Sequence, residues 1–383
     1  EVRVVRPLHL ALVVVCACVV AVGVLVFSSR EAQSAANLPQ GFVEQQIASG
    51  LSNASSMAFA PDGRIFVTEQ TGKLRVIKNG RLLPGPFVDL TRLVDSRGER
   101  GLLGVAFDPA FASNGYVYLY YTKEATRKTP AHNRVVRYTA RGDGAVSGSA
   151  RLILKLNNLS SAQNHNGGAI NFGADGRLYI AVGDNANGEN AQTTKNLLGK
   201  MLRINKTGSI PRTNPFYRKK RVEGKNKAIW AMGLRNPYTF AVQRTTGRIF
   251  INDVGAGKFE EINVGARGAN YGWPRFEGPE NAPRYAPPIF AYRHDGDPDT
   301  TGCAITGGAF YNPQVAQFPA EYSGDYFFAD FCNGWIRRYD PATGSVTGFA
   351  TGIQFPVDLE VGPGGALLYL ERGSGSVYRI ERP

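Results

Sequence analysis

Histidine and cysteine are scarce in this sequence. The 383 residues include only four of each, and no cluster of them has the spacing of a zinc site. Charged residues make up 20% of the chain and hydrophobic residues 43%. That balance excludes both a disordered chain and a polytopic membrane protein. The sequence therefore predicts a globular protein and gives no sign of zinc.

Acidic residues are in the minority. The 31 Asp and Glu stand against 44 Lys and Arg, which gives a formal net charge of +13. Basic runs such as Arg218 to Arg221 raise the question of nucleic acid, but no aromatic-basic platform or helical reader accompanies them. We therefore predict no nucleic-acid partner. A solvated loop, or adhesion to an anionic envelope, is the preferred explanation.

A long uncharged apolar run is found near the N-terminus, from Leu10 to Phe27. Arg3 and Arg6 precede it, and Arg30 with a small polar stretch follows it. Such a run suits either a cleaved signal peptide or an uncleaved N-terminal membrane anchor. We expect residues 1–36 to be this export segment, which acts as a membrane tether if it is retained. The predicted location is secreted, periplasmic or cell-envelope.

Two of the four cysteines, Cys16 and Cys18, fall inside that apolar run. Cys303 and Cys332 are then the only pair in the exported body of the chain. An oxidising compartment and an even count predict a disulfide between them, with two unrelated buried thiols as the alternative.

Turn residues and internal repeats predict an all-β fold. The sequence has 45 Gly and 22 Pro scattered between short apolar runs, which favours turns that join short strands. Six times, an apolar strand is followed by a turn of the Pro-Asp-Gly type, a second strand and often a third. The copies begin near Met57, Val105, Ile170, Phe240, Gly308 and Leu359.

One copy of this repeat cannot bury both of its faces. Six copies packed radially around a channel do bury them, so we predict a six-bladed β-propeller in residues 37–383. The segment Gly41 to Leu51 is expected to supply a strand to the last blade and close the ring. A β-sandwich would not need the repeat, and a β-helix would repeat at about 20 residues.

His165 is the candidate base. It lies in a polar, Gly-rich turn immediately before a predicted inner strand, where an imidazole can act near neutral pH. Asp184 ends the strand pair that this turn begins, so one hairpin can bring the carboxylate to the imidazole. The alternatives are a hydrogen-bonded loop histidine and a turn-capping aspartate.

Two further polar segments are candidate site regions. Arg235 lies at the entry of another inner strand, where it can stabilise an oxyanion, bind an anionic cofactor or pair with a neighbouring carboxylate. The Gly-rich segment Asn252 to Asn263 offers carboxylates and free backbone carbonyls. A hard cation such as Ca²⁺ requires these ligands.

At these places the sequence resembles the soluble aldose and glucose dehydrogenases that use pyrroloquinoline quinone (PQQ), also called the glucose/sorbosone dehydrogenase family. The resemblance runs from about Gly41 to Arg382. Its markers are Gly101 to Phe107, the His165 turn with Gly183-Asp184, Leu234 to Pro237, Glu261 to Asn263 and Asn270 to Pro274.

The resemblance implies a six-bladed propeller that oxidises an aldose or related sugar, with hydride transfer from the anomeric carbon to PQQ. His165 would be the general base, and Asp184 would hold its imidazole. Arg235 and Asn236 would contact the quinone, with Arg235 stabilising negative charge on the reduced oxygen. Glu99 falls where the family usually has a glutamine close to the substrate. The implied partners are a sugar and a soluble or membrane-bound electron acceptor.

Two calcium sites are also implied by the resemblance. The carbonyl groups of Gly255 and Ala256 match positions that bind the cofactor-associated Ca²⁺. Glu261 and the carbonyl group of Tyr271 match a second, structural site.

The sequence departs from the family where the family holds the three carboxylates of PQQ. Family members use a lysine of blade five and two arginines before the last blade, but Phe331 to Gly334 and Gln354 to Val357 contain no cation here. Loss of three cationic partners costs several kcal/mol unless other cations replace them. Arg372 and His294 are the candidate replacements.

The missing cations motivate a second hypothesis, a propeller of the same family that binds a sugar, polymer or protein without redox turnover, as Hedgehog-interacting proteins do. A third hypothesis is a calcium-dependent lactonase-type hydrolase, because six-bladed propellers also support that chemistry.

Overall fold

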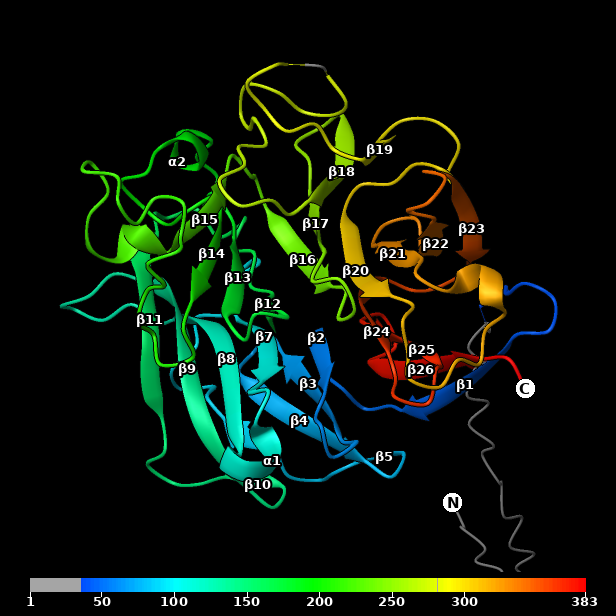
Figure 1. Ribbon diagram of the computed structural model, residues 1–383. Helices are drawn as coiled ribbons and strands as arrows, with labels where there is room; N and C mark the ends of the chain where they lie inside the picture. Colours follow the sequence, from blue (N-terminus) through cyan, green and yellow to red (C-terminus); the bar gives the residue numbers. More distant parts are fainter. Residues whose placement is uncertain (1–35, 281) are drawn as a thin grey trace, which may run out of the picture. The chain divides into compact units, whose positions relative to one another are not determined.

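The computed structural model describes residues 36–280 and 282–383, and nearly all of its regular structure is β-strand (Figure 1). The expectations for residues 1–36 concern a segment that lies outside the described residues, except for Ala36. Residues 35–383 form one compact unit. Among the described residues, no helix has the length and apolar character needed to cross a membrane.

The strands form six antiparallel sheets, which we call blades 1 to 6 in chain order. Blade 1 contains β2 (Ala54–Phe59), β3 (Ile65–Glu69), β4 (Lys73–Lys78), β5 (Arg81–Leu82) and β6 (Val88–Asp89). Blade 2 contains β7 (Leu102–Phe107), β8 (Tyr116–Lys123), β9 (His132–Arg141), β10 (Gly144–Ala145) and β11 (Arg151–Asn158). Blade 3 contains β12 (Ile170–Phe172), β13 (Leu178–Val182), β14 (Lys200–Ile204) and β15 (Ile229–Met232).

The second half of the chain repeats this plan. Blade 4 contains β16 (Pro237–Val242), β17 (Ile249–Asp253), β18 (Phe259–Val264) and β19 (Phe290–Arg293). Blade 5 contains β20 (Ile305–Phe310), β21 (Tyr326–Asp330), β22 (Trp335–Tyr339) and β23 (Val346–Ala350). Blade 6 contains β24 (Pro356–Val361), β25 (Leu367–Glu371), β26 (Ser376–Glu381) and β1 (Val43–Ala48). Within the described residues, the short helices lie in connections, at α1 (Phe111–Asn114), α2 (Glu189–Gln192), η1 (Gly224–Ala228) and η2 (Ala320–Tyr322).

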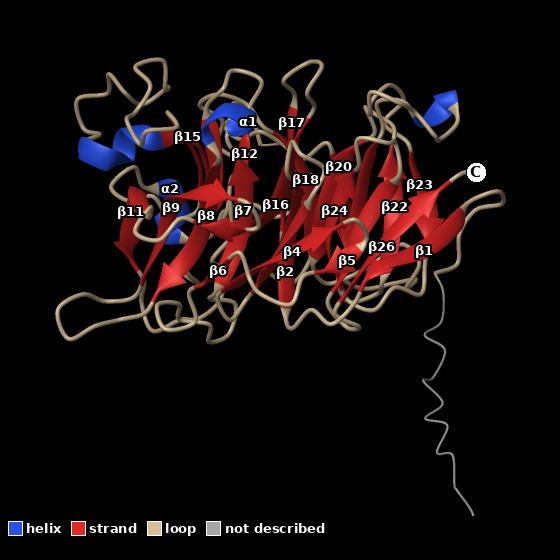
Figure 2. Cartoon of the chain, turned by 90° about the horizontal axis from the view of Figure 1, so that it is seen from below, coloured by secondary structure: helices blue, strands red, loops and turns tan. Residues whose placement is uncertain are grey.

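The first strands of the six blades contact one another in a closed ring around the centre (Figure 1). In the side view of Figure 2 the strands form one band, with loops on both sides of it. N-terminal β1 pairs with C-terminal β26, with Val43 opposite Glu381, and this pairing closes the ring. The predicted six-bladed propeller is thus confirmed. The repeat analysis found two or three strands per copy, whereas the structure has four or five. The outermost strands were missed because some are short or exposed, as β5 and β23 are, and others follow long insertions, as β15 and β19 do.

Hydrophobic side chains fill the spaces between neighbouring blades. Between blades 2 and 3, for example, Tyr118, Leu156, Ile180 and Leu202 are almost completely buried. Each fully buried side chain of this kind contributes about 1.5–3 kcal/mol. Every core cluster lies within the described residues of the compact unit. These clusters belong to one compact unit, residues 35–383, as expected of an independently folding domain.

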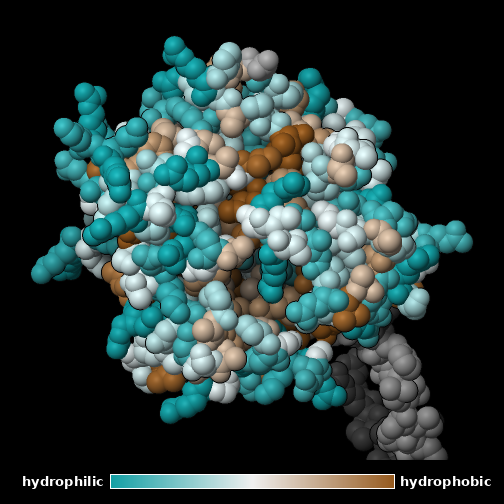
Figure 3. Space-filling view, viewed as in Figure 1, coloured by the Kyte–Doolittle hydropathy of each residue, from teal (hydrophilic) through white to brown (hydrophobic). Residues whose placement is uncertain are grey.

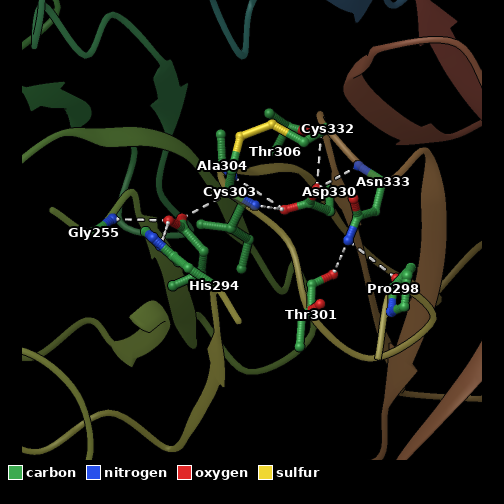
Figure 4. The surroundings of a disulfide bond; sticks show 12 residues. Gly255, His294, Pro298, Thr301, Cys303, Ala304, Thr306, Asp330, Cys332 and Asn333 are labelled. Carbon is green, nitrogen blue, oxygen red and sulfur yellow. Dashed lines mark hydrogen bonds and ion pairs between the residues drawn. A yellow bond between two sulfur atoms is a disulfide. The ribbon is translucent and has the colours of Figure 1, made fainter. Parts of the chain in front are cut away.

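The predicted disulfide is present in blade 5. Cys303 precedes β20, Cys332 follows β21, and their Cα atoms lie 5.7 Å apart. Figure 4 shows Asp330 directly beside the bridge, where it accepts hydrogen bonds from both connecting loops. The bridge and this carboxylate together join the entry of the first strand to the end of the second.

Candidate functional site

His165 and Asp184 meet at one end of blade 3. The turn that contains His165 leads into β12, and Asp184 follows β13, so the antiparallel pair brings them together. His165 Nδ1 lies 2.7 Å from Asp184 Oδ1, and the Asp184 side chain is only 1% exposed. An ionised Asp184 keeps a hydrogen on Nδ1 and makes Nε2 the basic nitrogen. Among the described residues, none forms a hydrogen bond with Nε2.

The second oxygen of Asp184 is also used. Trp273, from the connection between β18 and β19 of blade 4, donates its indole N–H to Asp184 Oδ2 at 2.8 Å. A carboxylate held on both oxygens has little freedom to rotate, so it fixes the imidazole plane. Sequence analysis included Trp273 only in the family marker Asn270 to Pro274. Its contact with Asp184, which lies 89 positions earlier, leaves no pattern in the sequence around either residue.

Blade 3 lacks a carboxylate that four other blades have at the end of their second strand. In four blades the second strand ends in a carboxylate, and this group accepts a backbone N–H from the loop that enters the first strand. The pairs are Glu69 with Ser52, Asp253 with Asn236, Asp330 with Cys303 and Glu371 with Gln354. In blade 3 Val182 ends that strand, and Asp184, two residues later, binds side chains instead. Blade 2 also lacks the carboxylate, since its second strand ends at Lys123, but only in blade 3 does a nearby aspartate hold a histidine.

Arg235 lies between blades 3 and 4, next to this pair. Its backbone N–H donates to Asp253 Oδ2 at 3.0 Å, and its Nη1 donates to the carbonyl oxygen of Val254 at 3.0 Å. Its guanidinium carbon is 5.6 Å from the centre of the Trp273 ring. The Nε–H is buried and, within the described part of the chain, has no hydrogen-bond partner. Seven other described arginines share this feature, so the position of the guanidinium beside Trp273 and Asp184, and not its free Nε–H, makes Arg235 a site candidate.

Glu99 and Asn236 complete the cluster. Glu99 Oε2 accepts the His165 backbone N–H at 2.7 Å and the Asn236 side-chain amide at 3.3 Å. The Asn236 side-chain oxygen accepts the Gly167 N–H at 3.0 Å. The structure therefore brings all five predicted catalytic and cofactor residues into one network. These contacts also hold His165 at a φ of 55°, which is uncommon for residues other than glycine.

Tyr238 is a further residue of this region that sequence analysis did not identify. It lies in β16 of blade 4. Its hydroxyl group donates a hydrogen bond of 3.3 Å to the carbonyl oxygen of Ser55 in blade 1, across the channel. Burial raises the pKa of its phenol well above the usual range, and the charges of Arg372, Asp358 and Glu99 also act on that pKa. Tyr238 therefore stays neutral and bridges opposite blades below the site.

The predicted metal ligands lie on blade 4. Glu261 of β18 is directly opposite Asp253 of β17, and both side chains are buried. Burial raises the pKa of Glu261 to about 7 and, with the charge of Glu261, raises the pKa of Asp253 well above its usual value. A cation would relieve this cost, although each of the four carboxylate oxygens already accepts an N–H group. The described residues contain no ready group of three His, Cys, Asp or Glu side chains for a metal.

The loop with Gly255 and Ala256 is ordered by another carboxylate. Glu277 Oε1 accepts the backbone N–H groups of residues 256–259 at 2.9–3.1 Å. The predicted carbonyl ligands of Gly255, Ala256 and Tyr271 accept no hydrogen bond from any described residue. They are thus available as ligands, although the structure holds them on two different segments.

Comparison with known proteins gives the family. A sequence model described as Glucose / Sorbosone dehydrogenase matches residues 51–379. The chain belongs to this family. It is 29% identical to the HIPL2 protein of Arabidopsis thaliana, over 90% of this chain and 63% of that protein. It is also 29% identical to quinoprotein glucose dehydrogenase B of Acinetobacter calcoaceticus, over 64% of this chain and 55% of that protein.

A solved structure supports the same assignment. The apo form of the soluble aldose sugar dehydrogenase of Escherichia coli superposes with a TM-score of 0.78 and 26% identity, covering 89% of this chain and all of that one. The chain spans less than two thirds of the length of the two curated relatives named above. Two of these relatives, the glucose dehydrogenase and the aldose sugar dehydrogenase, are thus named as sugar dehydrogenases.

The two predicted replacement cations are already engaged in this family member. Arg372 donates to the Ala54 carbonyl oxygen at 2.9 Å and to Gln70 Oε1 at 2.6 Å. His294 Nε2 lies 2.7 Å from the buried carboxylate of Glu260, which raises the pKa of the imidazole. Neither is free to replace the missing cations. Where they are missing, the rings of Phe331 and Phe355 lie 5.0 Å apart.

Lys200 is a buried cation behind the site. Its Nζ donates to the carbonyl oxygens of Asn190, Ala191 and Leu198 at 2.6–3.1 Å, and so holds the loop that follows Asp184. Burial lowers the pKa of its ammonium group to about 7, against an opposing effect of the Asp184 charge. The amine is therefore close to its titration point near neutral pH.

This lysine gives a testable pH dependence. An unfolded lysine titrates near 10.4, so between about pH 7 and 10 the unfolded chain binds more protons than the native one, and stability rises with pH. We expect the free energy of unfolding of the wild type, relative to Lys200→Met, to rise by up to about 1.4 kcal/mol per pH unit in this window. Urea denaturation at several pH values measures it. A difference that does not change with pH would contradict the prediction.

Proposed function

We propose that the protein is an extracytoplasmic, PQQ-dependent dehydrogenase that oxidises an aldose or a related sugar at the anomeric carbon. The observation that carries the proposal is the coupling of His165 to a carboxylate fixed on both oxygens, beside the guanidinium of Arg235. Family membership and the quinoprotein relative support the redox chemistry. A soluble or membrane-bound acceptor would then remove the electrons.

The residues of the site divide the work as follows. His165 Nε2 accepts the proton of the anomeric hydroxyl group, and Asp184 stabilises the imidazolium that forms. Arg235 and Asn236 bind and orient the oxygens of the oxidant, and the fixed charge of Arg235 stabilises negative charge that develops there. PQQ supplies the two-electron hydride acceptor when it is bound. Glu99 orients the His165 backbone and Asn236 from the substrate side.

Calcium is part of the proposal. The carbonyl groups of Gly255 and Ala256 would hold the cofactor-associated ion, and Glu261 with the Tyr271 carbonyl would hold a structural ion. The buried Asp253 and Glu261 pair supports a cation in this region, because two adjacent buried carboxylates favour a positive charge between them.

A reconstitution assay tests the function. The purified protein is mixed with PQQ and Ca²⁺, and dye reduction is followed with a panel of aldoses. Turnover that requires PQQ supports the proposal. Absence of both turnover and quinone binding would overturn it. Binding of PQQ is measured separately by fluorescence, so a failed dye can be distinguished from a failed site.

A non-catalytic binding protein is the second candidate function. Phe331 and Phe355 favour it, because two aromatic rings occupy the regions where a trianionic cofactor needs cations. Aromatic faces bind sugar rings and protein side chains instead. In that case the sugar would bind in calorimetry with no PQQ-dependent turnover.

Trp273 gives a test of how Asp184 is held. Trp273→Phe removes the indole N–H but keeps a ring beside Arg235, so one oxygen of a buried carboxylate loses its donor. We expect kcat to fall about tenfold with little change in KM, because the imidazole is less well oriented. The control is Trp230→Phe, since Trp230 is a buried tryptophan that packs on Tyr179 away from Asp184. Equal kcat in both variants would contradict this role.

A further inference from the structure

Positive charge is concentrated in the connection between β14 and β15. Residues 206–227, which we call the basic insertion, contain eight basic residues against one acidic residue, a net charge of +7. The whole chain has a net charge of +13. About half of the excess charge therefore lies in one connection of blade 3. Its basic residues are Lys206, Arg212, Arg218, Lys219, Lys220, Arg221, Lys225 and Lys227.

The basic insertion is held firmly to the propeller. The side-chain amide of Asn214, only 3% exposed, donates to the carbonyl oxygens of Arg203 and Lys227 at 2.8 and 3.0 Å. Ile210 and Phe216 pack against the core between blades 2 and 3, and Val222 is buried. The basic side chains are thus displayed from a fixed surface. A loop that only needed to be solvated would not require these contacts.

Three arginines surround one hollow at this surface. Arg212 and Arg218 come from the basic insertion, and Arg267 comes from the neighbouring β18–β19 connection of blade 4. Arg267 Nε donates to the Thr213 carbonyl oxygen at 2.9 Å, which joins the two connections. Within the described residues, none of the three arginines forms an ion pair with a carboxylate. A hollow lined by unpaired guanidinium groups fits a phosphate.

The position of the insertion leaves the candidate site open. Lys200 at the start of β14 is opposite Val182, beside the His165 end of the blade, and Ile204 at its end is opposite Leu178. The basic insertion follows Ile204, so it leaves the sheet at the end away from His165. Hydrophilic side chains project over the left-hand part of the surface in Figure 3, where Figure 1 shows this connection.

The chemistry of the basic insertion selects among anionic partners. It offers no free aromatic platform for nucleobases, because Phe216 packs in the core and the Tyr217 ring lies 5.1 Å from Lys227 Nζ. It exposes no large hydrophobic side chain of the kind that anchors protein interfaces. Clustered lysines and arginines without such anchors are typical of segments that bind anionic lipid surfaces.

We infer that the basic insertion binds the phosphate headgroups of an anionic lipid bilayer. The exposed run from Arg218 to Arg221 supplies the long-range attraction, and the three-arginine hollow accepts a headgroup phosphate. Such a patch adds to the membrane affinity of a single apolar segment, such as the run Leu10 to Phe27. The surface binds independently of sugar oxidation, so neither result decides the other.

Vesicle sedimentation with residues 36–383 tests the inference. We expect binding to vesicles of phosphatidylglycerol and phosphatidylcholine, no binding to phosphatidylcholine alone, and release at high salt. Lys219→Glu/Lys220→Glu should weaken binding at least about tenfold. The side chains of both lysines are exposed and have no partner among the described residues, so thermal unfolding should be unchanged.

The matched control is Arg127→Glu/Lys128→Glu, which makes the same charge change at an exposed pair between β8 and β9. This variant should bind vesicles nearly as well as the wild type. Equal losses in the two variants would show an effect of net charge alone and overturn the inference. No binding to anionic vesicles, with retention on a heparin column that the Lys219/Lys220 variant loses, would assign the surface to an anionic polymer instead.

Discussion

Replacement of His165 by asparagine is expected to lower the turnover of an aldose by about a hundred- to ten-thousand-fold and to leave the propeller folded. Asparagine cannot accept the hydroxyl proton at neutral pH. It does adopt positive φ angles readily, as the φ of 55° at this position requires. The backbone N–H to Glu99 is also kept. Alanine is the poorer choice, because a left-handed backbone conformation costs it about 1–2 kcal/mol.

Steady-state kinetics with saturating PQQ measures the effect, and His132→Asn is the matched control. His132 is also buried. Its ring nitrogens contact Arg134 of β9 and the carbonyl oxygen of Pro130 in the loop before β9. That variant should keep near wild-type turnover. A rate for His165→Asn close to the wild type would mean that the base is misassigned.

The blades could be predicted from the sequence because their two inner strands carry the repeated pattern. The pairs β12–β13 and β24–β25 each combine an apolar strand with a Gly-containing turn, and all residues of β13 and β25 are buried. The outer strands carry no such signal. β5 has two residues, and β23 exposes Thr347 and Gly348. Tertiary pairing, and not local pattern, makes these segments strands.

The site could be predicted as far as hairpin geometry reaches. His165 and Asp184 flank one strand pair, so their contact follows from local topology. Trp273 and Tyr238 could not be found in this way, because each forms a hydrogen bond with a residue of a different blade. Likewise, the sequence offered Arg372 and His294 as free cations. Their partners, Gln70 and Glu260, belong to other elements and appear only in the folded chain.

A carboxylate at the end of the second strand has a structural role in four blades, and blade 3 lacks it at that position. Where it ends the second strand, as at Asp253 and Asp330, it satisfies loop N–H groups that would otherwise be buried without a partner. In blade 3 the carboxylate stands two residues later, and the loop N–H of His165 goes to Glu99 instead. Asp184 is thereby free to hold an imidazole.

Replacement of Asp330 by asparagine is expected to cost about 3–5 kcal/mol of the free energy of unfolding. Its Oδ2 accepts the Tyr292 hydroxyl and two backbone N–H groups, and its Oδ1 accepts the N–H groups of Cys332 and Asn333, all at 2.9–3.1 Å. In either orientation an amide NH₂ would face at least two buried N–H donors. The Cys303–Cys332 bridge keeps the loops close but cannot replace these hydrogen bonds.

Asp325→Asn is the matched control, because it makes the same change at a buried aspartate just before the same strand. Burial raises the pKa of Asp325 to about 6, and its Oδ2 has an ion pair with Arg338 at 3.3 Å but no hydrogen bond. Because burial already disfavours the ionised form of Asp325, neutralising this carboxyl should change stability by at most about 1 kcal/mol. Guanidinium denaturation of oxidised protein separates the two variants. Equal destabilisation would mean that loss of charge in blade 5, and not the loop hydrogen bonds of Asp330, sets the cost.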